Sequence, residues 1–408
     1  MSQILLFTIS LLCLLYSVFI LLYRYWWDQL EPFRLDWHLD KESGNSALVE
    51  KIGLEKREVG SGSLMGGLRK FSVIIPARNE ADNIKTCLLS ILEGDYPKDS
   101  YDITVVDDYS TDGTAAIVQE LMAKYSQIRI LSLEAELGSH RVNAYKKKAL
   151  ELAISKVEGD WIVTTDADCI VPKGWLIYFD QYIAATGKKF VAAPVRFIDQ
   201  RTFLSRFQVL DFLSLQGVTA AAVGAGFLSM CNGANLCYEK KTFHAVEGFK
   251  GIDQLASGDD MLLMHKMQVH DAGSTGYLFA RQSIVSTIPM PDLRSFINQR
   301  VRWASKAGRY QDWKIKAVLL LVYLWNLGLF GLLVTGFFRP EYWSWWLGFL
   351  LIKFGIEWLF MRKVARFFDQ SYLLRSFLIM QPFHILYTII AGWLGLFGTY
   401  HWKDRKVK

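Results

Sequence analysis

The sequence predicts an α/β unit with a mostly parallel sheet, joined to membrane-spanning helices at both of its ends. Between residues 71 and 165, short apolar runs rich in β-branched residues alternate with stretches whose apolar residues have helical spacing. This alternation is typical of strand–helix units in a parallel, Rossmann-like sheet. Long apolar runs near both termini, with 51% hydrophobic residues and 14 tryptophans in 408 residues, indicate a membrane-embedded part.

The charge and the cysteine content narrow the class of protein. The formal net charge is +6, and basic residues cluster beside the apolar runs. We assign this excess to the membrane surface and expect no nucleic-acid partner. The five cysteines are odd in number and form no CxxC pair. Neither a zinc site nor a disulfide framework is therefore expected, and a reducing compartment is favoured.

The first apolar run, Ile4–Tyr23, is long enough to cross a bilayer. It has no small-residue cleavage site, so we expect a signal anchor and not a cleaved signal peptide. Arg24 and the basic residues after it place the region that follows on the cytoplasmic side of the cell membrane. The Gly/Ser-rich stretch Gly60–Gly67 is expected to be a linker.

Elements of the α/β unit follow in order. Four strands are predicted at Phe71–Ile75, Ile103–Val106, Ile128–Leu133 and Trp161–Thr165. Three helices are predicted between them at Glu80–Leu92, Thr114–Tyr125 and Lys146–Ser155. The three lysines at 146–148 are expected to form a solvated helix start, with contact between one of them and a phosphate as the alternative.

The later run Phe207–Met230 resembles a membrane span in length but carries Gln208, Asp211 and Gln216. We expect a helix that lies against the membrane or under the site, with a span as the less favoured alternative.

Three more apolar runs close the chain, at Ala317–Phe338, Trp343–Phe360 and Phe377–Tyr400. Three crossings after a cytoplasmic unit would put the C-terminus outside. The basic residues between 403 and 408 favour the inside instead. A re-entrant or hairpin last run, broken at Gln381-Pro382, is one resolution.

Polar residues stand at the carboxyl ends of the predicted strands, where parallel α/β sheets bind ligands. They are Pro76, Arg78 and Glu80 after the first strand, Asp107 and Asp108 after the second, and Asp166 and Asp168 after the fourth. Two aspartates two residues apart on an extended chain point the same way, so Asp166 and Asp168 can share Mg²⁺ or Mn²⁺. Such a cation suits a diphosphate leaving group.

The pair Asp107-Asp108 favours a nucleotide ligand, because carboxylates at a strand end can accept hydrogen bonds from a uracil or a ribose. The alternative is a plain turn in which Ser110 or Asp112 caps the next helix.

A second acidic pair, Asp259-Asp260, opens the helical stretch Met261–Met267. These residues could simply favour the helix dipole. The functional alternative is a general base for an acceptor hydroxyl. Asn232 lies in a turn of small residues that lets the backbone approach a ligand.

Near residue 300, Gln299, Arg302 and Trp303 are spaced i, i+3 and i+4, so on a helix they share one face. Arg302 could hold a diphosphate and Trp303 could form a flat wall against a sugar. The alternative is a membrane-surface helix with arginine at the headgroups.

Taken in order, these segments resemble the motifs of family 2 membrane glycosyltransferases. The segments are Ser72–Glu80, Val106–Thr114, Asp166–Asp168, Asp259-Asp260 and Gln299–Trp303, and the resemblance covers about residues 71–310. It is to the GT-A branch that includes cellulose, chitin and hyaluronan synthases and ceramide glucosyltransferases. One departure is Asp259, where the family usually has glutamate.

The resemblance implies a role for each group of site residues. The donor would be bound by Pro76, Arg78, Glu80, Asp107, Asp108, Asp166, Gln299 and Arg302. The acceptor would be bound by Asn232, Asp259 and Trp303. Mg²⁺ or Mn²⁺ would be held by Asp168 and Asp166, and Asp260 would be the catalytic base.

The expected division of the chain follows from these segments: an anchor at 1–25, an interfacial and linker segment at 26–70, a GT-A unit at 71–290, an amphipathic interfacial helix at 291–314 and about three spans at 315–408.

The expected activity is inverting transfer from a nucleotide sugar, UDP-linked by preference, to a lipid or lipid-linked hydroxyl at the cytoplasmic membrane face. A processive β-glycan synthase and a catalytically silent nucleotide-binding subunit are the alternatives.

Overall fold

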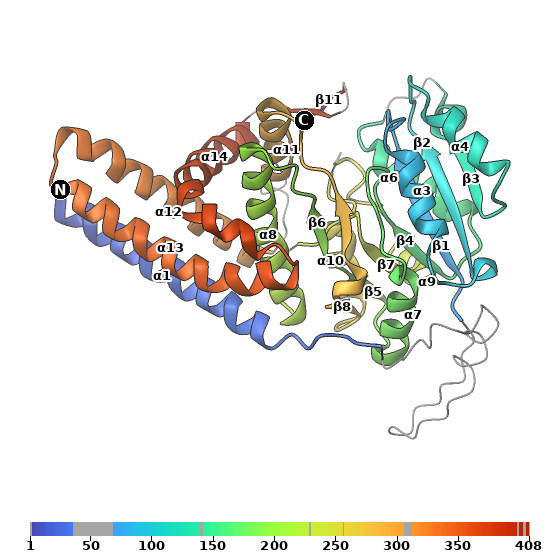
Figure 1. The fold of residues 1–408 in the computed structure, drawn as a ribbon, viewed down its shortest axis with the longest axis horizontal. Helices are drawn as coiled ribbons and strands as arrows, with labels where there is room; N and C mark the ends of the chain where they lie inside the picture. The colour runs from blue at the N-terminus through green and yellow to red at the C-terminus, as the bar shows by residue number, and fades with distance from the viewer. Residues whose placement is uncertain are drawn as a thin grey trace.

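The computed structural model describes residues 2–35, 68–138, 142–227, 230–255, 257–305, 312–397, 400–402 and 405–407. The predicted linker Gly60–Gly67 lies outside these residues. An α/β unit occupies one end of the molecule, and a bundle of long helices occupies the other (Figure 1).

A seven-stranded sheet forms the centre of the α/β unit, in the order β3-β2-β1-β4-β7-β5-β8. The predicted parallel strands are confirmed as β1 (Phe71–Ala77), β2 (Tyr101–Asp107), β3 (Ile128–Ser132) and β4 (Trp161–Thr164). Three shorter strands that the sequence analysis did not predict complete the sheet: β5 (Phe190–Ala192), β7 (Leu236–Glu239) and β8 (Thr275–Tyr277).

The short strand β7 runs antiparallel to both of its neighbours, β4 and β5, so the sheet is mostly but not wholly parallel. A separate parallel pair is formed by β6 (Val195–Phe197) and β9 (Val285–Thr287). The central strands are fully buried, and Val73, Ile103 and Val163 have no exposed surface. Burial on both faces explains their continuous β-branched sequence.

Helices connect and cover the strands. They are α3 (Ile84–Leu92), α4 (Thr114–Met122), α5 (Leu133–Leu137), α6 (Tyr145–Lys156), α7 (Trp175–Thr186), α9 (Lys240–Ala245), α10 (Met261–His270) and α11 (Leu293–Ala304). Helix α3 begins four residues later than predicted. Residues before it form a turn, in which the amide of Asn83 donates to the carbonyl of Glu80.

Five helices in the described part of the chain are long and apolar enough to cross a membrane. They are α1 (Ser2–Asp28), α8 (Phe203–Gly224), α12 (Trp313–Phe338), α13 (Tyr342–Phe367) and α14 (Phe377–Phe397). In α8, 78% of the most apolar window is buried inside the protein, against 17–28% in the other four. Helix α8 is therefore an internal helix, which agrees with the expectation of a helix under the site.

Both ends of α14 lie close to the α/β unit. Before it, Tyr372 of the short helix Ser371–Ser376 donates a hydrogen bond of 3.2 Å to Asp199. At its other end, Gly395 packs against Ala304 of α11. A hairpin of β10 (Tyr400–Trp402) and β11 (Arg405–Val407) follows beside α11. The predicted break at Gln381-Pro382 is absent, since α14 is one continuous helix with Pro382 inside it.

Gly159, just before β4, gives a direct test of the packing between β4 and β1. A Cβ at this position would lie 2.6 Å from Ser72 Oγ, 2.7 Å from Ser72 N and 2.9 Å from Phe71 C. Because two of these atoms are backbone, we predict that Gly159→Ala destabilises the protein by about 1–3 kcal/mol. Gly113→Ala is the matched control, since its Cβ would meet only Ala81, at 3.9 Å. Equal thermal midpoints for the two variants in detergent would contradict this packing.

Candidate active site

The carboxyl ends of β1, β2 and β4 meet at one edge of the sheet and border a single large cavity. Its volume is about 1200 Å³. Arg78 and Glu80 follow β1, Asp108 follows β2, and Asp166 and Asp168 follow β4; all five line the cavity. The convergence expected from parallel strands is therefore present in the structure.

Side-chain hydrogen bonds fasten the loop after β1 to the loop after β2. Arg78 Nη1 donates to the carbonyl of Asp108 at 2.8 Å, and the amide of Glu80 donates to Thr114 Oγ1 at 2.8 Å. Asp112 accepts from the amide of Ala81 at 3.0 Å. Burial opposes the charge of Asp112, but hydrogen bonds from Thr114 and Ala81 hold the pKa of its carboxyl below the usual value. Asp112 thus joins two loops in addition to capping a helix.

Lys146 neutralises the carboxylates at the centre of the site. Its ammonium lies 2.7 Å from Asp166 Oδ1 and 3.4 Å from Asp259 Oδ2. Burial disfavours the charge of Lys146, but the carboxylates of Asp166, Asp259 and Asp260 outweigh it and raise the pKa of the lysine above its ordinary value.

The neighbouring lysine, Lys147, is fully buried, whereas Lys146 is half-buried, and Lys147 holds the loop that precedes the second acidic pair. Its ammonium donates to the carbonyls of Ile252, Leu255 and Ser257 at 2.6, 2.8 and 3.0 Å. The prediction of a solvated lysine run was therefore wrong for Lys146 and Lys147. Because lysine side chains are rarely buried, a run of three lysines predicts a solvent-exposed surface. In this structure each of the two ammonium groups has several oxygen partners instead.

Asp260 caps the N-terminus of α10 and lies against the turn at Gly233. Its Oδ1 accepts from the amide of Met261 at 2.7 Å, and its Oδ2 accepts from the amide of Gly233 at 3.3 Å. A Cβ on Gly233 would lie 3.3 Å from Asp259 Oδ2 and 3.4 Å from Lys146 Nζ. The small residue lets this turn approach the charged groups, and Asn232 beside it lines the cavity.

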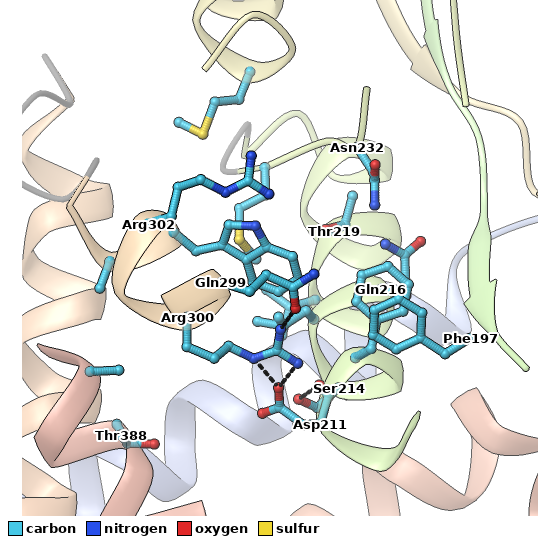
Figure 2. A pocket seen from close by; sticks show the side chains of 18 of the residues that line it. Phe197, Asp211, Ser214, Gln216, Thr219, Asn232, Gln299, Arg300, Arg302 and Thr388 are labelled. Atoms are coloured by element: carbon cyan, nitrogen blue, oxygen red, sulfur yellow. Dashed lines mark hydrogen bonds and ion pairs between the residues drawn. The ribbon is translucent and has the colours of Figure 1, made fainter. Parts of the chain in front are cut away.

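Helix α11 forms the opposite wall with Gln299, Arg302 and Trp303. Between them, Arg300 is buried and pairs with Asp211 of α8 through two contacts to Oδ2, of 2.9 Å from Nε and 2.6 Å from Nη2. The guanidinium of Arg300 also lies 4.3 Å from the ring centroid of Trp303. Figure 2 shows Arg300 reaching Asp211 while Arg302 extends separately toward the cavity.

Sequence reasoning missed both partners of this pair. An acidic residue in an otherwise apolar helix was the available signal for Asp211, because such a charge is buried only with a partner.

Most sequence-predicted site residues are brought together at this cavity. Those that line it are Pro76, Arg78, Glu80, Asp108, Asp166, Asp168, Asn232, Asp259, Asp260, Gln299, Arg302 and Trp303. Asp107 does not line it. Its carboxylate is buried at the end of β2, and Oδ1 has no hydrogen-bond partner among the described residues.

A divalent cation would find two carboxylates at the cavity, Asp166 and Asp168. Within the described residues, no group of three acidic, histidine or cysteine side chains forms a preassembled metal site. Two carboxylates suit Mg²⁺ or Mn²⁺ that takes its other ligands from a bound phosphate and water. The residues present therefore fit a cation that arrives with its substrate.

Comparison with models of protein families shows to which family the chain belongs. Residues 72–217 match the family model described as glycosyl transferase family 2, and residues 161–395 match glycosyl transferase family group 2. The second match covers more than half of the chain. The chain belongs to the family 2 glycosyltransferases.

Curated relatives match this glycosyltransferase over part of their length. Glycosyltransferase AglE of Haloferax volcanii is 34% identical over 126 residues, which are 31% of this chain and 39% of AglE. The β-monoglucosyldiacylglycerol synthase of Synechocystis is 31% identical over 113 residues, 28% of this chain and 22% of the synthase. The matched segments thus span less than half of these relatives.

A solved structure supports the fold over nearly the whole chain. The mannosyltransferase PcManGT from Pyrobaculum calidifontis aligns with 95% of this chain and 99% of its own, with a TM-score of 0.51 and 16% identity. The mostly parallel sheet with its helices is that of the GT-A glycosyltransferases.

The role of Lys146 can be tested against its neighbour on the same helix. Lys146→Met leaves Asp166 and Asp259 without their shared cation. We predict that the free energy of unfolding falls by about 1–3 kcal/mol. This is less than the loss of a fully buried ion pair would cost, because Asp166 is partly exposed to solvent. Lys148→Met removes only an exposed pair with Glu151 and should cost about 0.5 kcal/mol or less.

Thermal unfolding at neutral pH measures the full contribution of Lys146. Its folded pKa lies above the unfolded value of about 10.4, so its stabilisation is complete below that pH and is lost as pH rises through the folded pKa. Equal melting of the two lysine variants would refute the neutralising role.

Proposed function

We propose that this glycosyltransferase is an inverting enzyme of the cytoplasmic membrane face, which transfers a sugar from a nucleotide donor to a hydroxyl of a lipid acceptor. The observation that carries the proposal is the extent of the cavity. It holds the carboxylates of the sheet edge, and it continues between α1, α8, α12, α13 and α14. A donor at the sheet and an acceptor from the bundle would meet in this one space.

The nucleoside of the donor would lie against the ends of β1 and β2. Pro76, Arg78 and Glu80 line that part of the cavity together with Asp108. Asp107 lies at the same strand end but does not line the cavity, so no direct donor contact is proposed for it. We propose UDP as the nucleotide.

The diphosphate would lie between the end of β4 and α11. Arg302 would donate to its oxygens, and Gln299 would contribute a further polar contact. Asp168 would be the main protein ligand of Mg²⁺ or Mn²⁺, because Asp166 Oδ1 already accepts from Lys146. When bound, this cation would neutralise charge that develops on the departing diphosphate.

Asp260 would act as the general base. It would take the proton of the acceptor hydroxyl while that oxygen attacks the anomeric carbon from the face opposite the diphosphate. The bond to the diphosphate oxygen breaks as the new bond forms, so an α-linked donor gives a β-linked product. Hydrogen bonds from Met261 and Gly233 hold the carboxylate in place.

A lipid acceptor is supported by the bundle and by one relative. Trp303, Asn232 and Asp259 line the cavity on the acceptor side of Asp260 in this proposal. The Synechocystis relative is named as a synthase of monoglucosyldiacylglycerol, a glycolipid. The solved mannosyltransferase was crystallised with GDP-Man and Mn²⁺, which supports a nucleotide-sugar donor and a divalent cation.

The positions of the helices support a definite topology. We propose that α1, α12 and α13 cross the membrane and that α14, whose two ends lie near the α/β unit, stays on the side of that unit without crossing. The C-terminal lysines and arginine would then lie on the cytoplasmic side with the catalytic unit, as the positive-inside rule favours. The conflict between span number and terminal charge disappears in this arrangement.

The base assignment is tested by Asp260→Asn in nanodiscs that contain native lipid extract, with a panel of radiolabelled nucleotide sugars. We predict that kcat falls by about 10²–10⁴-fold while nucleotide affinity is retained. Asp271→Asn is the control, because Asp271 ends the same helix and pairs with Lys189 at the surface. Unchanged turnover of the Asp260 variant would refute the assignment.

Metal dependence is tested separately by chelation. EDTA should abolish transfer, and Mn²⁺ or Mg²⁺ should restore it. Asp168→Asn should raise the cation concentration needed for half-maximal rate by about tenfold, as for loss of one ligand group. Asp99→Asn, at an exposed site, should leave that concentration unchanged. Full activity in EDTA would exclude the cation from the reaction.

A further inference from the structure

A polar cluster lies inside the helical bundle, away from the carboxylates of the sheet edge. We call it the bundle cluster, and its members are Tyr16 of α1, Lys353 and Glu357 of α13, and Gln381 and His384 of α14. All of them except Lys353 line the cavity.

Four members of the bundle cluster satisfy one another. Lys353 Nζ donates to Glu357 Oε1 and to Gln381 Oε1, each at 2.6 Å. Gln381 Nε2 donates to Glu357 Oε2 at 2.7 Å, and the hydroxyl of Tyr16 donates to Glu357 Oε1. The charges of Lys353 and Glu357 therefore cancel within the cluster.

His384 differs from the other members because neither of its ring nitrogens makes a hydrogen bond to a described residue. Nδ1 is buried and has no hydrogen-bond partner in the described part of the chain. Nε2 lies 3.9 Å from Asp211 Oδ1, beyond hydrogen-bond distance. An unsatisfied polar atom in an apolar bundle costs free energy unless a ligand completes it.

The wall around the bundle cluster is apolar. Phe19 and Ile20 of α1 and residues 318–322 of α12 line the cavity there, and all are hydrophobic. The cavity, at about 1200 Å³, is also larger than the range of about 300–1000 Å³ that suits one small ligand. A donor at the sheet edge thus leaves room for a second, amphiphilic molecule.

The charges of the side chains around the bundle cluster indicate what kind of headgroup the second molecule carries. Near the bundle cluster, Lys353 is paired with Glu357 and Arg300 is paired with Asp211. Arg302 and Lys316, which also line the cavity, belong to α11 and to the first turn of α12 and not to the bundle cluster. A phosphate would need a cation that is not already neutralised. Hydroxyl groups need only acceptors and donors, which His384, Glu357 and Gln381 provide.

We infer that the bundle cluster is a subsite for a neutral, hydroxyl-bearing headgroup of the lipid acceptor, with the half-buried ring of His384 as a direct hydrogen-bond partner. The apolar wall formed by α1 and α12 holds the upper part of the lipid chain. Figure 2 shows the side of the cavity where Asp211, Ser214 and Thr219 of α8 face the arginines of α11. The inference rests on the proposed transfer to lipid.

The subsite is tested by binding of radiolabelled octyl β-glucoside to the full chain in phosphatidylcholine nanodiscs, without any donor. We expect saturable binding that unlabelled octyl glucoside displaces and octyl phosphate does not. His384→Leu should weaken binding by about tenfold, as for loss of one buried hydrogen bond. His384→Gln, whose longer amide can replace the outer ring nitrogen, should retain binding.

Thr335→Val is the control variant, because its hydroxyl donates within α12 to the carbonyl of Gly331 and does not line the cavity. Displacement by octyl phosphate, or equal affinity in His384→Leu and wild type, would overturn the inference. If His384→Leu does not fold, the competition between octyl phosphate and octyl glucoside for the wild-type protein still tests the inference. The binding assay contains no donor and is therefore independent of transfer. Saturable glucoside binding, together with no transfer in the separate assay with the nucleotide-sugar panel, would leave the subsite standing and refute the proposed function.

Discussion

The site depends on the ion pairs that Lys146 makes with carboxylates from two separate parts of the chain. Asp166 follows β4, and Asp259 precedes α10, nearly one hundred residues later. Without a cation, the carboxylates of Asp166, Asp259 and Asp260 would repel one another beside an apolar sheet. Lys147 adds a mechanical constraint, since it binds three carbonyls in the loop before Asp259. Helix α6 thereby sets the distance between the end of β4 and the start of α10.

A second buried pair couples this site to the helical bundle. Asp211 belongs to the internal helix α8, and Arg300 belongs to α11, whose Gln299, Arg302 and Trp303 line the cavity. The hydroxyl of Tyr387 on α14 also donates to Asp211. One carboxylate thus positions three helices around the opening between the sheet edge and the bundle. Because removal of either charge leaves the other buried without a partner, this junction is strongly constrained.

Local patterns were sufficient to predict the parallel strands and the acidic residues at their ends, because β-branched runs and strand-end polarity are properties of adjacent residues. They failed where distant residues decide the structure. Glu80 is held in a loop by Thr114, so α3 begins later than its apolar spacing suggests. The three-residue strands β5 and β8 are too short to show a period. Lys146 and Lys147 were predicted in solvent because their oxygen partners are remote in sequence.

The central claim is that donor and acceptor meet at Asp260 in one cavity shared by the sheet and the bundle. The most direct measurement is the structure of the full chain in nanodiscs with Mn²⁺ and a non-hydrolysable nucleotide sugar. The account predicts the diphosphate between Asp168 and Arg302, with the anomeric carbon open toward Asp260 and the bundle. A nucleotide bound elsewhere, or a sugar shielded from Asp260, would contradict it.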